Sequence, residues 1–445
     1  MEVDAPHGAL VNEPLPQTIR RVAFPAIAAN LLMTTFHTVD TFWIGRYLGA
    51  DALAAVTGSV FWIWLVISIG EMVSIGVDAI AARRHGERRP REAAHSVGDG
   101  VVFGFSLGVA IAIASPFLLT SLFTLMQTGS DITVIGKHYL GLYLLGMPLI
   151  FAFFAVDAAF RAAGDTRTPL YILLVTTVAG LLLDPLLILG AGPVPAMGVR
   201  GAALATLVPR GVACVLGVWL LRRRAMVTFA APRLDVWAQI ARIGLPAATT
   251  GVVFSFIYVL LTRTTTQFGT PALAALGLGF RIEGFVYVVS VGAGAAVAAI
   301  VGQSIGAGDT ERARKAGWSA VQLVSVLGAM MALVTVLVPE QLAGLFTTDA
   351  AVIAEAARYL RIAAFSQLFL GAEVVLESAM GGAGWTLPPM LGSTAITALR
   401  IPVGAWAAAQ FGTTGLWWTL ALTAAARGVL MAGLWASGRC RRVAV

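Results

Sequence analysis

Charged residues are scarce in this chain. They make up 12% of its 445 residues, whereas 58% are hydrophobic. A soluble domain is about half apolar and about one-quarter charged. Because water could not solvate so apolar a surface, we expect lipid to surround the protein. This composition excludes a soluble enzyme of two or three domains.

Cysteine is almost absent as well. Cys214 lies in an apolar stretch and Cys440 in a basic tail, and this spacing indicates neither a disulfide framework nor a metal site. Residues 1–18 carry acids and prolines without a hydrophobic core, so they do not form a signal peptide. The net charge of +7 comes from short basic runs between apolar stretches, which is typical of membrane topology rather than of nucleic-acid binding.

Long apolar stretches fill the rest of the chain. A membrane-spanning helix needs about 20 apolar residues. This criterion predicts an all-α membrane protein with twelve transmembrane helices, at residues 19–45, 52–82, 95–126, 133–160, 168–190, 198–221, 236–267, 272–303, 316–346, 351–380, 387–410 and 415–437. Most loop arginines fall on the side that carries both termini, so we expect a multi-pass protein of the plasma (inner) membrane with both termini in the cytoplasm.

The second half of the sequence repeats the first. When the halves are aligned in a constant register, the segment from Ala52 to Ala55 matches Ala272 to Ala275, and Pro25 pairs with Pro246 one position away from that register. Each repeat has an even number of spans, so the two six-helix repeats are parallel, as in transporters with alternating access. The predicted parts are an N-terminal tail (1–18), a first lobe (19–222), a linker (223–235), a second lobe (236–438) and a basic tail (439–445).

Acidic residues inside the apolar stretches are functional candidates because an ionised group near the bilayer centre costs at least about 2.5–3.5 kcal/mol. An acid that the scaffold needs should occur in both repeats, whereas one needed for coupling can occur in one. Asp157 has an acidic counterpart in Glu377. Asp40 and Asp184 have none, and both lie late in odd-numbered helices of the first repeat. If their side chains meet, they form a carboxylate pair suited to binding a proton or another cation.

Three neighbours belong to this predicted site. His37 lies one turn before Asp40 on the same helix face, where it either titrates or is simply satisfied by Asp40 or by a backbone carbonyl. Pro185 follows Asp184, and Pro25 lies inside the first helix. Each proline removes a backbone amide and gives its helix a place to bend, so both are hinge candidates.

A further set of residues could line a substrate cleft between the lobes. Acids there would attract a cationic substrate, and aromatic rings would bind a flat cation through cation–π contacts. For the acids, ion pairs or hydrogen bonds within the scaffold are the alternative. For the rings, the alternative is anchoring at the membrane interface. The cleft candidates are Glu71, Glu283, Glu373, Glu377, Phe36 and Phe154.

Four motifs resemble the multidrug and toxic compound extrusion (MATE) family. The first helix and its following loop contain AFPAIAANLL, TVDTFWIG and LGADALAAV (residues 23–56). RAAGDTRTP at 161–169 is similar to the family's loop after helix four, and LLDPLLILG at 182–190 to its helix five. GQSIGAGDTERAR at 302–314 resembles the loop after helix eight. The resemblance covers residues 17–438 and implies a fold of the MATE/MOP type.

The resemblance also implies a site. Helix seven lacks the acid of the NorM-like branch, so the chain looks more like the DinF-like branch, whose cation site lies in the first lobe. In the first lobe, the resemblance makes Asp40 and Asp184 the central carboxylates and implies that the hydroxyl of Thr206 lies in the site. The DinF-like pattern has Asn where this chain has Gly180. Losing that oxygen weakens a sodium cage, so we expect coupling to H+, with Na+ at Asp40 and Asp184 as the alternative.

The sequence therefore predicts a secondary antiporter that exports cationic or amphiphilic small molecules, such as drugs, toxins and metabolites, by alternating access. Its expected partners are the lipid bilayer and organic cations, with no cofactor and no nucleic acid, and we expect a monomer. A lipid-linked saccharide flippase of the same superfamily and a non-transporting membrane scaffold are the alternatives. A membrane hydrolase is not expected because the chain has no HExxH motif and no clustered His and Asp ligands.

Overall fold

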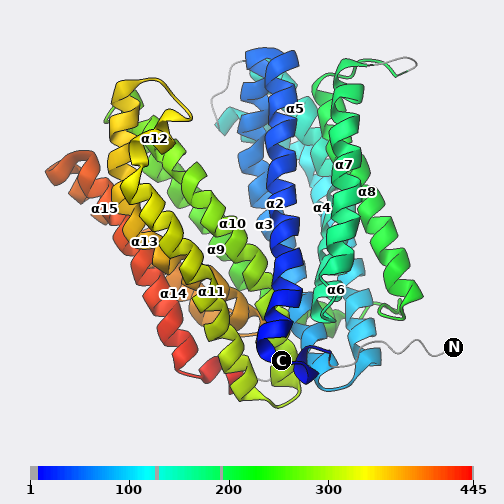
Figure 1. The fold of residues 1–445 in the computed structure, drawn as a ribbon. Coiled ribbons are helices and arrows are strands. Elements are labelled where there is room, and N and C mark those ends of the chain that lie inside the picture. The colour runs from blue at the N-terminus through cyan, green and yellow to red at the C-terminus, as the bar shows by residue number, and fades with distance from the viewer. Residues whose placement is uncertain (1–8, 126–129, 191–193, 443–445) are drawn as a thin grey trace.

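The computed structural model describes residues 9–125, 130–190 and 194–442, and every element labelled in it is a helix (Figure 1). The outermost parts of the two predicted tails, 1–8 and 443–445, lie outside the described residues. The first half contains α1 (Ala9–Asn12), α2 (Leu15–Tyr47), α3 (Gly49–Gly86), α4 (Pro90–Leu125), α5 (Ser130–Leu145), α6 (Met147–Ala162), α7 (Arg167–Leu189) and α8 (Val199–Arg223). The second half contains α9 (Leu234–Thr266), α10 (Thr270–Gly306), α11 (Thr310–Leu337), α12 (Pro339–Gly344), α13 (Ala350–Gly382), α14 (Leu387–Ala398), α15 (Arg400–Ala436) and the short 3₁₀ helix η1 (Arg439–Arg442).

Among the described residues, ten segments are long and apolar enough to cross a membrane, or eleven if the bent pair α5 and α6 counts as one span. The last of these segments, Leu387–Ala436, has 50 residues. A straight helix of that length would measure about 75 Å, more than twice the hydrocarbon thickness of about 30 Å. Its backbone leaves helical geometry at Gly412, so the segment crosses twice. The prediction of an all-α multi-pass membrane protein is confirmed.

The structure breaks several helices that the sequence predicted as continuous. The span 133–160 bends by 47° between α5 and α6, next to Pro148 in the first turn of α6. The span 316–346 ends at Leu337, because Pro339 starts the separate short helix α12. The span 387–410 is divided at Leu399, between α14 and α15. Residues 9–18 of the predicted tail are largely helical, since they contain α1 and the start of α2.

The two halves share their hydrophobic core at the end of the molecule that carries both chain ends. Leu10 and Ala23 pack in one buried cluster with Val297, Met380 and Cys440. A second cluster joins α3 to Ile240 and Ile243 of α9. Figure 1 shows the halves side by side at this lower end and diverging toward the other. We call the lower end the terminal end.

Two equivalent contacts between α3 and α10 join the halves at the terminal end. Gly86 of α3 and Gly306 of α10 match in the register of the repeat. A Cβ atom at Gly86 would overlap the carbonyl of Gln303, and one at Gly306 would overlap the carbonyl of Arg83. The Gln303 amide also donates to the carbonyl oxygen of Ala162 in the first half at 2.6 Å. Glycine therefore allows the two helices to meet backbone to backbone.

The N-terminal helix α1 ties both halves together at the same end. Its Leu10 is fully buried, and its side chain lies against Gly164 of the first half. From the second half, the Arg312 guanidinium donates to the carbonyl oxygens of Leu10 and Glu13, the latter at 2.7 Å. The N-terminal segment thus bridges the two halves by contacting both of them.

Candidate functional site

The structure brings Asp40 of α2 and Asp184 of α7 together in the interior of the first half. The Asp40 residue is 5% exposed and Asp184 is fully buried. The two side chains are close enough for a hydrogen bond, which forms once one carboxyl group carries a proton. No donor among the described residues satisfies either oxygen of Asp184. A buried carboxylate without a donor is costly, so this pair favours binding a proton or another cation.

Polar groups from two further helices surround the carboxyl pair. Tyr139 of α5 is 4% exposed and interacts electrostatically with both acids. Arg210 of α8 donates to the Tyr143 hydroxyl at 3.1 Å and lies 3.4 Å from Nε2 of His37. The Arg210 charge also acts on Asp40. His37 therefore contacts Arg210 rather than standing alone beside the acids.

Phe36 of α2 packs against Gly180 of α7, one helical turn before Asp184. A Cβ atom at Gly180 would lie 2.8 Å from Cε2 of Phe36 and 3.3 Å from the carbonyl oxygen of Ala205. Thr206, the next residue of α8, is 3% exposed. The space that an Asn side chain would use at position 180 is filled by the Phe36 ring. Phe36, predicted as a cleft residue, thus packs beside the carboxyl pair.

The two hinge candidates lie inside continuous helices, Pro25 in α2 and Pro185 in α7. Near Pro25, the Thr166 hydroxyl donates to the carbonyl oxygen of Val22 at 2.9 Å. The second half repeats this bond, with Thr386 donating to Ile243 at 2.7 Å near Pro246. The proline and its bonded threonine therefore belong to the scaffold that both halves share.

Three of the predicted cleft acids lie within electrostatic range of Tyr287 of α10, where the halves meet. Glu71 from α3 in the first half and Glu373 and Glu377 from α13 in the second all interact electrostatically with it. Glu373 forms an ion pair with Arg427 of α15, with an O–N distance of 2.9 Å. The two side chains are only 6% and 7% exposed.

The other two cleft candidates lie apart from this group. Glu283 accepts a hydrogen bond from the Tyr359 hydroxyl at 3.2 Å within the second half. Phe154 stacks on Phe151, with ring centroids 6.1 Å apart, and both rings pack against Gly70 of α3. The structure therefore places Phe154 beside the helix that carries Glu71, and Glu283 in a separate environment.

A single arginine nearer the terminal end, Arg161, contacts two more acids. Arg161 of α6 pairs with Asp157 one turn earlier, and its Nε lies 3.9 Å from Asp78 of α3. It also donates to the Ser74 hydroxyl at 2.9 Å. Asp78 thus pairs with Arg161 rather than with the arginines that follow it on its own helix.

Asp165, in the loop between α6 and α7, is a structural residue of the RAAGDTRTP motif. It accepts hydrogen bonds from the Thr168 hydroxyl at 2.5 Å and from Arg224 at 2.6 Å. Burial alone would raise the pKa of this carboxyl group, but the bonds from Thr168 and Arg224 outweigh it, so the pKa lies below its ordinary value. The carboxylate stabilises the start of α7.

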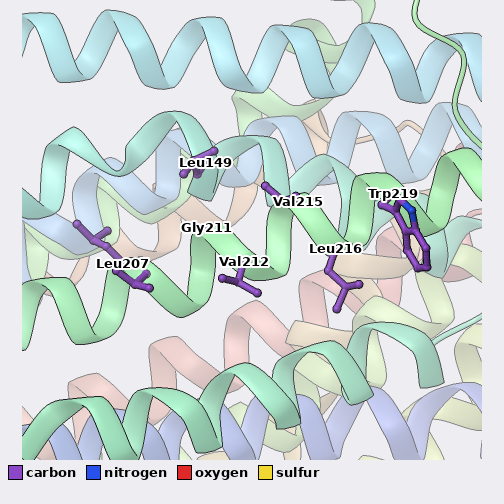
Figure 2. Close-up of a pocket in the computed structure, with 8 residues that line it drawn as sticks. Leu149, Leu207, Gly211, Val212, Val215, Leu216 and Trp219 are labelled. Atoms are coloured by element: carbon purple, nitrogen blue, oxygen red, sulfur yellow. The ribbon is translucent and has the colours of Figure 1, made fainter. Parts of the chain in front are cut away.

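A groove lies away from all of these charges, between α6 and α8. Figure 2 shows it lined by apolar side chains that include Leu149, Val212 and Trp219. Val215 on the same wall is 65% exposed. In a membrane protein such a surface faces lipid, so this groove is not part of the candidate site.

Sequence reasoning overlooked the basic residues inside the spans. Arg210 and Arg427 both stand in apolar stretches, and the cost that singles out intramembrane acids applies equally to them. Within the described part of the chain, no group of three or more His, Cys, Asp or Glu side chains could hold a metal ion. The letters GFSLG at 104–108 match a nucleophile-elbow pattern, yet they lie inside the continuous helix α4 rather than at a strand-to-helix turn.

The fold and the buried carboxyl pair define a two-lobed membrane transporter. The chain belongs to the MatE family, whose model matches residues 25–186 and 246–406. It is 31% identical over 432 residues to the multidrug resistance protein NorM of Burkholderia vietnamiensis, covering 93% of this chain and 92% of that one.

Other known proteins agree with this assignment. The chain is 27% identical over 388 residues to the probable multidrug resistance protein YoeA of Bacillus subtilis, covering 85% and 84% of the two chains. The crystal structure of the Vibrio cholerae MATE transporter VcmN in its bent form superposes with a TM-score of 0.87 at 24% identity, over 95% and 97% of the two chains. The predicted family and fold are confirmed, and these relatives are membrane transporters rather than enzymes.

Proposed function

We propose that this protein is a secondary antiporter that exports cationic or amphiphilic small molecules in exchange for protons. The observation that carries the proposal is the buried pair Asp40–Asp184, which occurs in one half of a duplicated fold. An acid retained in one half only is not required by the shared scaffold. The relatives NorM and YoeA are named as multidrug resistance proteins, which supports drugs as substrates.

The arrangement of the two halves supports alternating access. The halves meet at the terminal end through the close contacts of Gly86 and Gly306 and diverge toward the other end (Figure 1). In the proposed cycle, a proton enters from the open side and binds between Asp40 and Asp184. The bound proton removes the repulsion between the carboxylates, α2 bends near Pro25, and the substrate leaves. The halves then rock and the proton is released on the other side.

Three acids favour a cationic substrate over a lipid-linked saccharide. All three act electrostatically on Tyr287 where the halves meet, and they are Glu71, Glu373 and Glu377. They make this surface rich in acidic residues, whereas a flippase for an anionic lipid-linked sugar is expected to have a cationic cleft. Arg427 neutralises only Glu373 by direct contact.

The environment of Gly180 supports the proton as the coupling ion. A sodium site needs several oxygen ligands, and the Phe36 ring fills the space in which a side-chain oxygen at position 180 would stand. A proton needs a single oxygen. Sodium is the alternative that the experiment below separates from it.

The distribution of arginines supports a location in the plasma (inner) membrane with the terminal end in the cytoplasm. The arginines in the loops or at the helix ends on that side include Arg83, Arg84, Arg224, Arg233 and Arg312. We propose that the protein works as a monomer, because each chain contains both lobes and the complete carboxyl pair.

The test uses proteoliposomes that contain the purified protein and a fluorescent organic cation. A pH gradient and a sodium gradient are imposed in separate samples, and cation movement is followed by fluorescence. We expect movement under the pH gradient alone. Movement under the sodium gradient alone would show that the coupling ion is sodium rather than the proton. If none of several organic cations moves under either gradient, the proposed antiport is refuted.

A further inference from the structure

Arg210 is a partly buried cation near the carboxyl pair that the proposed exchange does not use. Its helix, α8, packs against α7, which carries Asp184. The guanidinium donates to the Tyr143 hydroxyl at 3.1 Å and approaches Nε2 of His37 to 3.4 Å. Two helices, α5 and α2, therefore hold its planar head in place.

The arginine is a duplicated residue whose ion pair occurs in one half only. Arg210–Gly211 matches Arg427–Gly428 in the same register that relates Gly198 to Gly415. Arg427 is neutralised by Glu373 at 2.9 Å. The counterpart of Glu373 in the first half, in the register that relates Asp157 to Glu377, is Phe153.

The charge of Arg210 is consequently not neutralised by direct contact. Among the described side chains, no carboxylate lies within ion-pair distance of it, and its two contacts are a phenol and an imidazole. Its charge acts instead on Asp40 and on Tyr139. The titratable groups that contact it or feel its charge are His37 and Asp40 from α2 and Tyr139 and Tyr143 from α5. Asp184 from α7 in turn interacts with Asp40 and Tyr139.

We propose that Arg210 determines which ion the carboxyl pair accepts, by placing a fixed positive charge where it opposes a bound sodium ion. This inference rests on the proposed antiport at Asp40 and Asp184. With Arg210 present, two carboxylates and one guanidinium give the pocket a net charge of −1, and a single proton completes its neutrality. The Arg210 charge opposes the binding of either cation, but a proton forms a covalent O–H bond with a carboxylate, whereas a sodium ion depends on electrostatic attraction and a cage of oxygens. The same repulsion therefore excludes sodium while the proton still binds.

The size of the effect follows from Coulomb's law. A unit charge about 6 Å from a monovalent cation, at an effective permittivity of about 20, changes cation affinity on the order of 100-fold. Removing the charge of Arg210 should therefore raise the affinity for sodium by about this factor. Replacing it by Lys should leave sodium binding unchanged.

The test measures sodium binding without transport, so that it is independent of the proposed antiport. Wild type, Arg210→Met, Arg210→Gln and Arg210→Lys are purified in detergent, and their thermal unfolding is recorded in NaCl and in choline chloride. A ligand that binds only the folded protein raises its unfolding temperature. Asp184→Asn combined with Arg210→Met is the matched control, because it removes the carboxylate that the sodium ion would contact.

We expect sodium to stabilise the Met and Gln variants specifically, and neither wild type, the Lys variant nor the double variant. Gln keeps hydrogen-bonding capacity toward Tyr143, so it separates the charge from the loss of packing if the Met variant does not fold. Sodium-specific stabilisation of wild type would overturn the proposal, as would folded Met or Gln variants that respond to sodium no more than wild type. A separate outcome would distinguish the two proposals. If wild type moves no substrate under any gradient but sodium still stabilises the Met and Gln variants, the antiport is refuted and the role of Arg210 in ion selectivity is retained.

Discussion

Breaking the ion pair between Glu373 and Arg427 should destabilise the protein more than removing both partners. The pair lies inside the second half with side chains 6% and 7% exposed, and its single contact measures 2.9 Å. Replacing Arg427 by Met leaves an uncompensated buried carboxylate, which costs about 3–5 kcal/mol of the free energy of unfolding. Replacing Glu373 by Met in addition removes that charge as well.

The geometry of the pair sets the expectation for the double variant. Oε2 of Glu373 and Nε of Arg427 have no hydrogen-bond partner among the described residues. A pair with such incomplete bonding is worth little, and apolar replacement of both partners is typically neutral or stabilising by about 1–4 kcal/mol. Arg427→Met should therefore be rescued by Glu373→Met.

The assay is equilibrium unfolding of the purified single and double variants in mixed micelles, with Arg358→Met as the control. Arg358 pairs with Glu355 at the surface, where its side chain is 52% exposed, so its loss should cost about 1 kcal/mol or less. A double variant as unstable as Arg427→Met alone would refute the reasoning, because the damage would then come from lost packing rather than from an isolated charge.

Three further changes have outcomes that the structure specifies. Gly180→Asn forces a side chain into the Phe36 ring, so it should lower the free energy of unfolding by about 1–3 kcal/mol. Phe36→Ala in the same chain should relieve this loss. An unaltered free energy of unfolding of Gly180→Asn would contradict the packing of Phe36 against Gly180. Asp165→Asn weakens the charge-assisted bonds from Thr168 and Arg224, so it should cost about 1 kcal/mol at pH 7. Because the folded-state pKa is lowered, this contribution is complete above the ordinary pKa of the carboxyl group and is lost as the pH falls through the lowered value. Wild type and variant should therefore converge in acid, and a constant difference would exclude this cause. Arg312→Met removes the donors to Leu10 and Glu13, so hydrogen exchange at residues 9–13 should accelerate while that of α13 stays unchanged.

Hydropathy and the repeat predicted the architecture because both follow from physical requirements that act on every residue of a span. Lipid requires about 20 apolar residues per crossing, and the duplication pairs Gly86 with Gly306, the two glycines whose contacts join the halves. The breaks at Gly146 and Leu399 escaped prediction, because a bend inside an apolar stretch leaves the hydropathy unchanged.

The site was predicted in part. Asp40 and Asp184 stood out because an acid without a counterpart in the other repeat is visible in the sequence, and the structure brings them together. The role of Phe36 beside Gly180 depends on the angle between α2 and α7, which no residue pattern specifies. Arg210 was present in the sequence as a basic residue inside a span, and its contact with Tyr143 links helices 67 residues apart in sequence.

The most direct test of the central claim is proton-driven efflux by Asp40→Asn in proteoliposomes, beside wild type and the control Glu92→Gln, whose side chain is 52% exposed. The amide keeps the size of the carboxyl group but cannot exchange a proton. We predict that Asp40→Asn inserts and folds normally yet loses all efflux driven by the pH gradient, while Glu92→Gln keeps wild-type efflux. Full gradient-driven efflux by Asp40→Asn would contradict the assignment of the carboxyl pair as the coupling site.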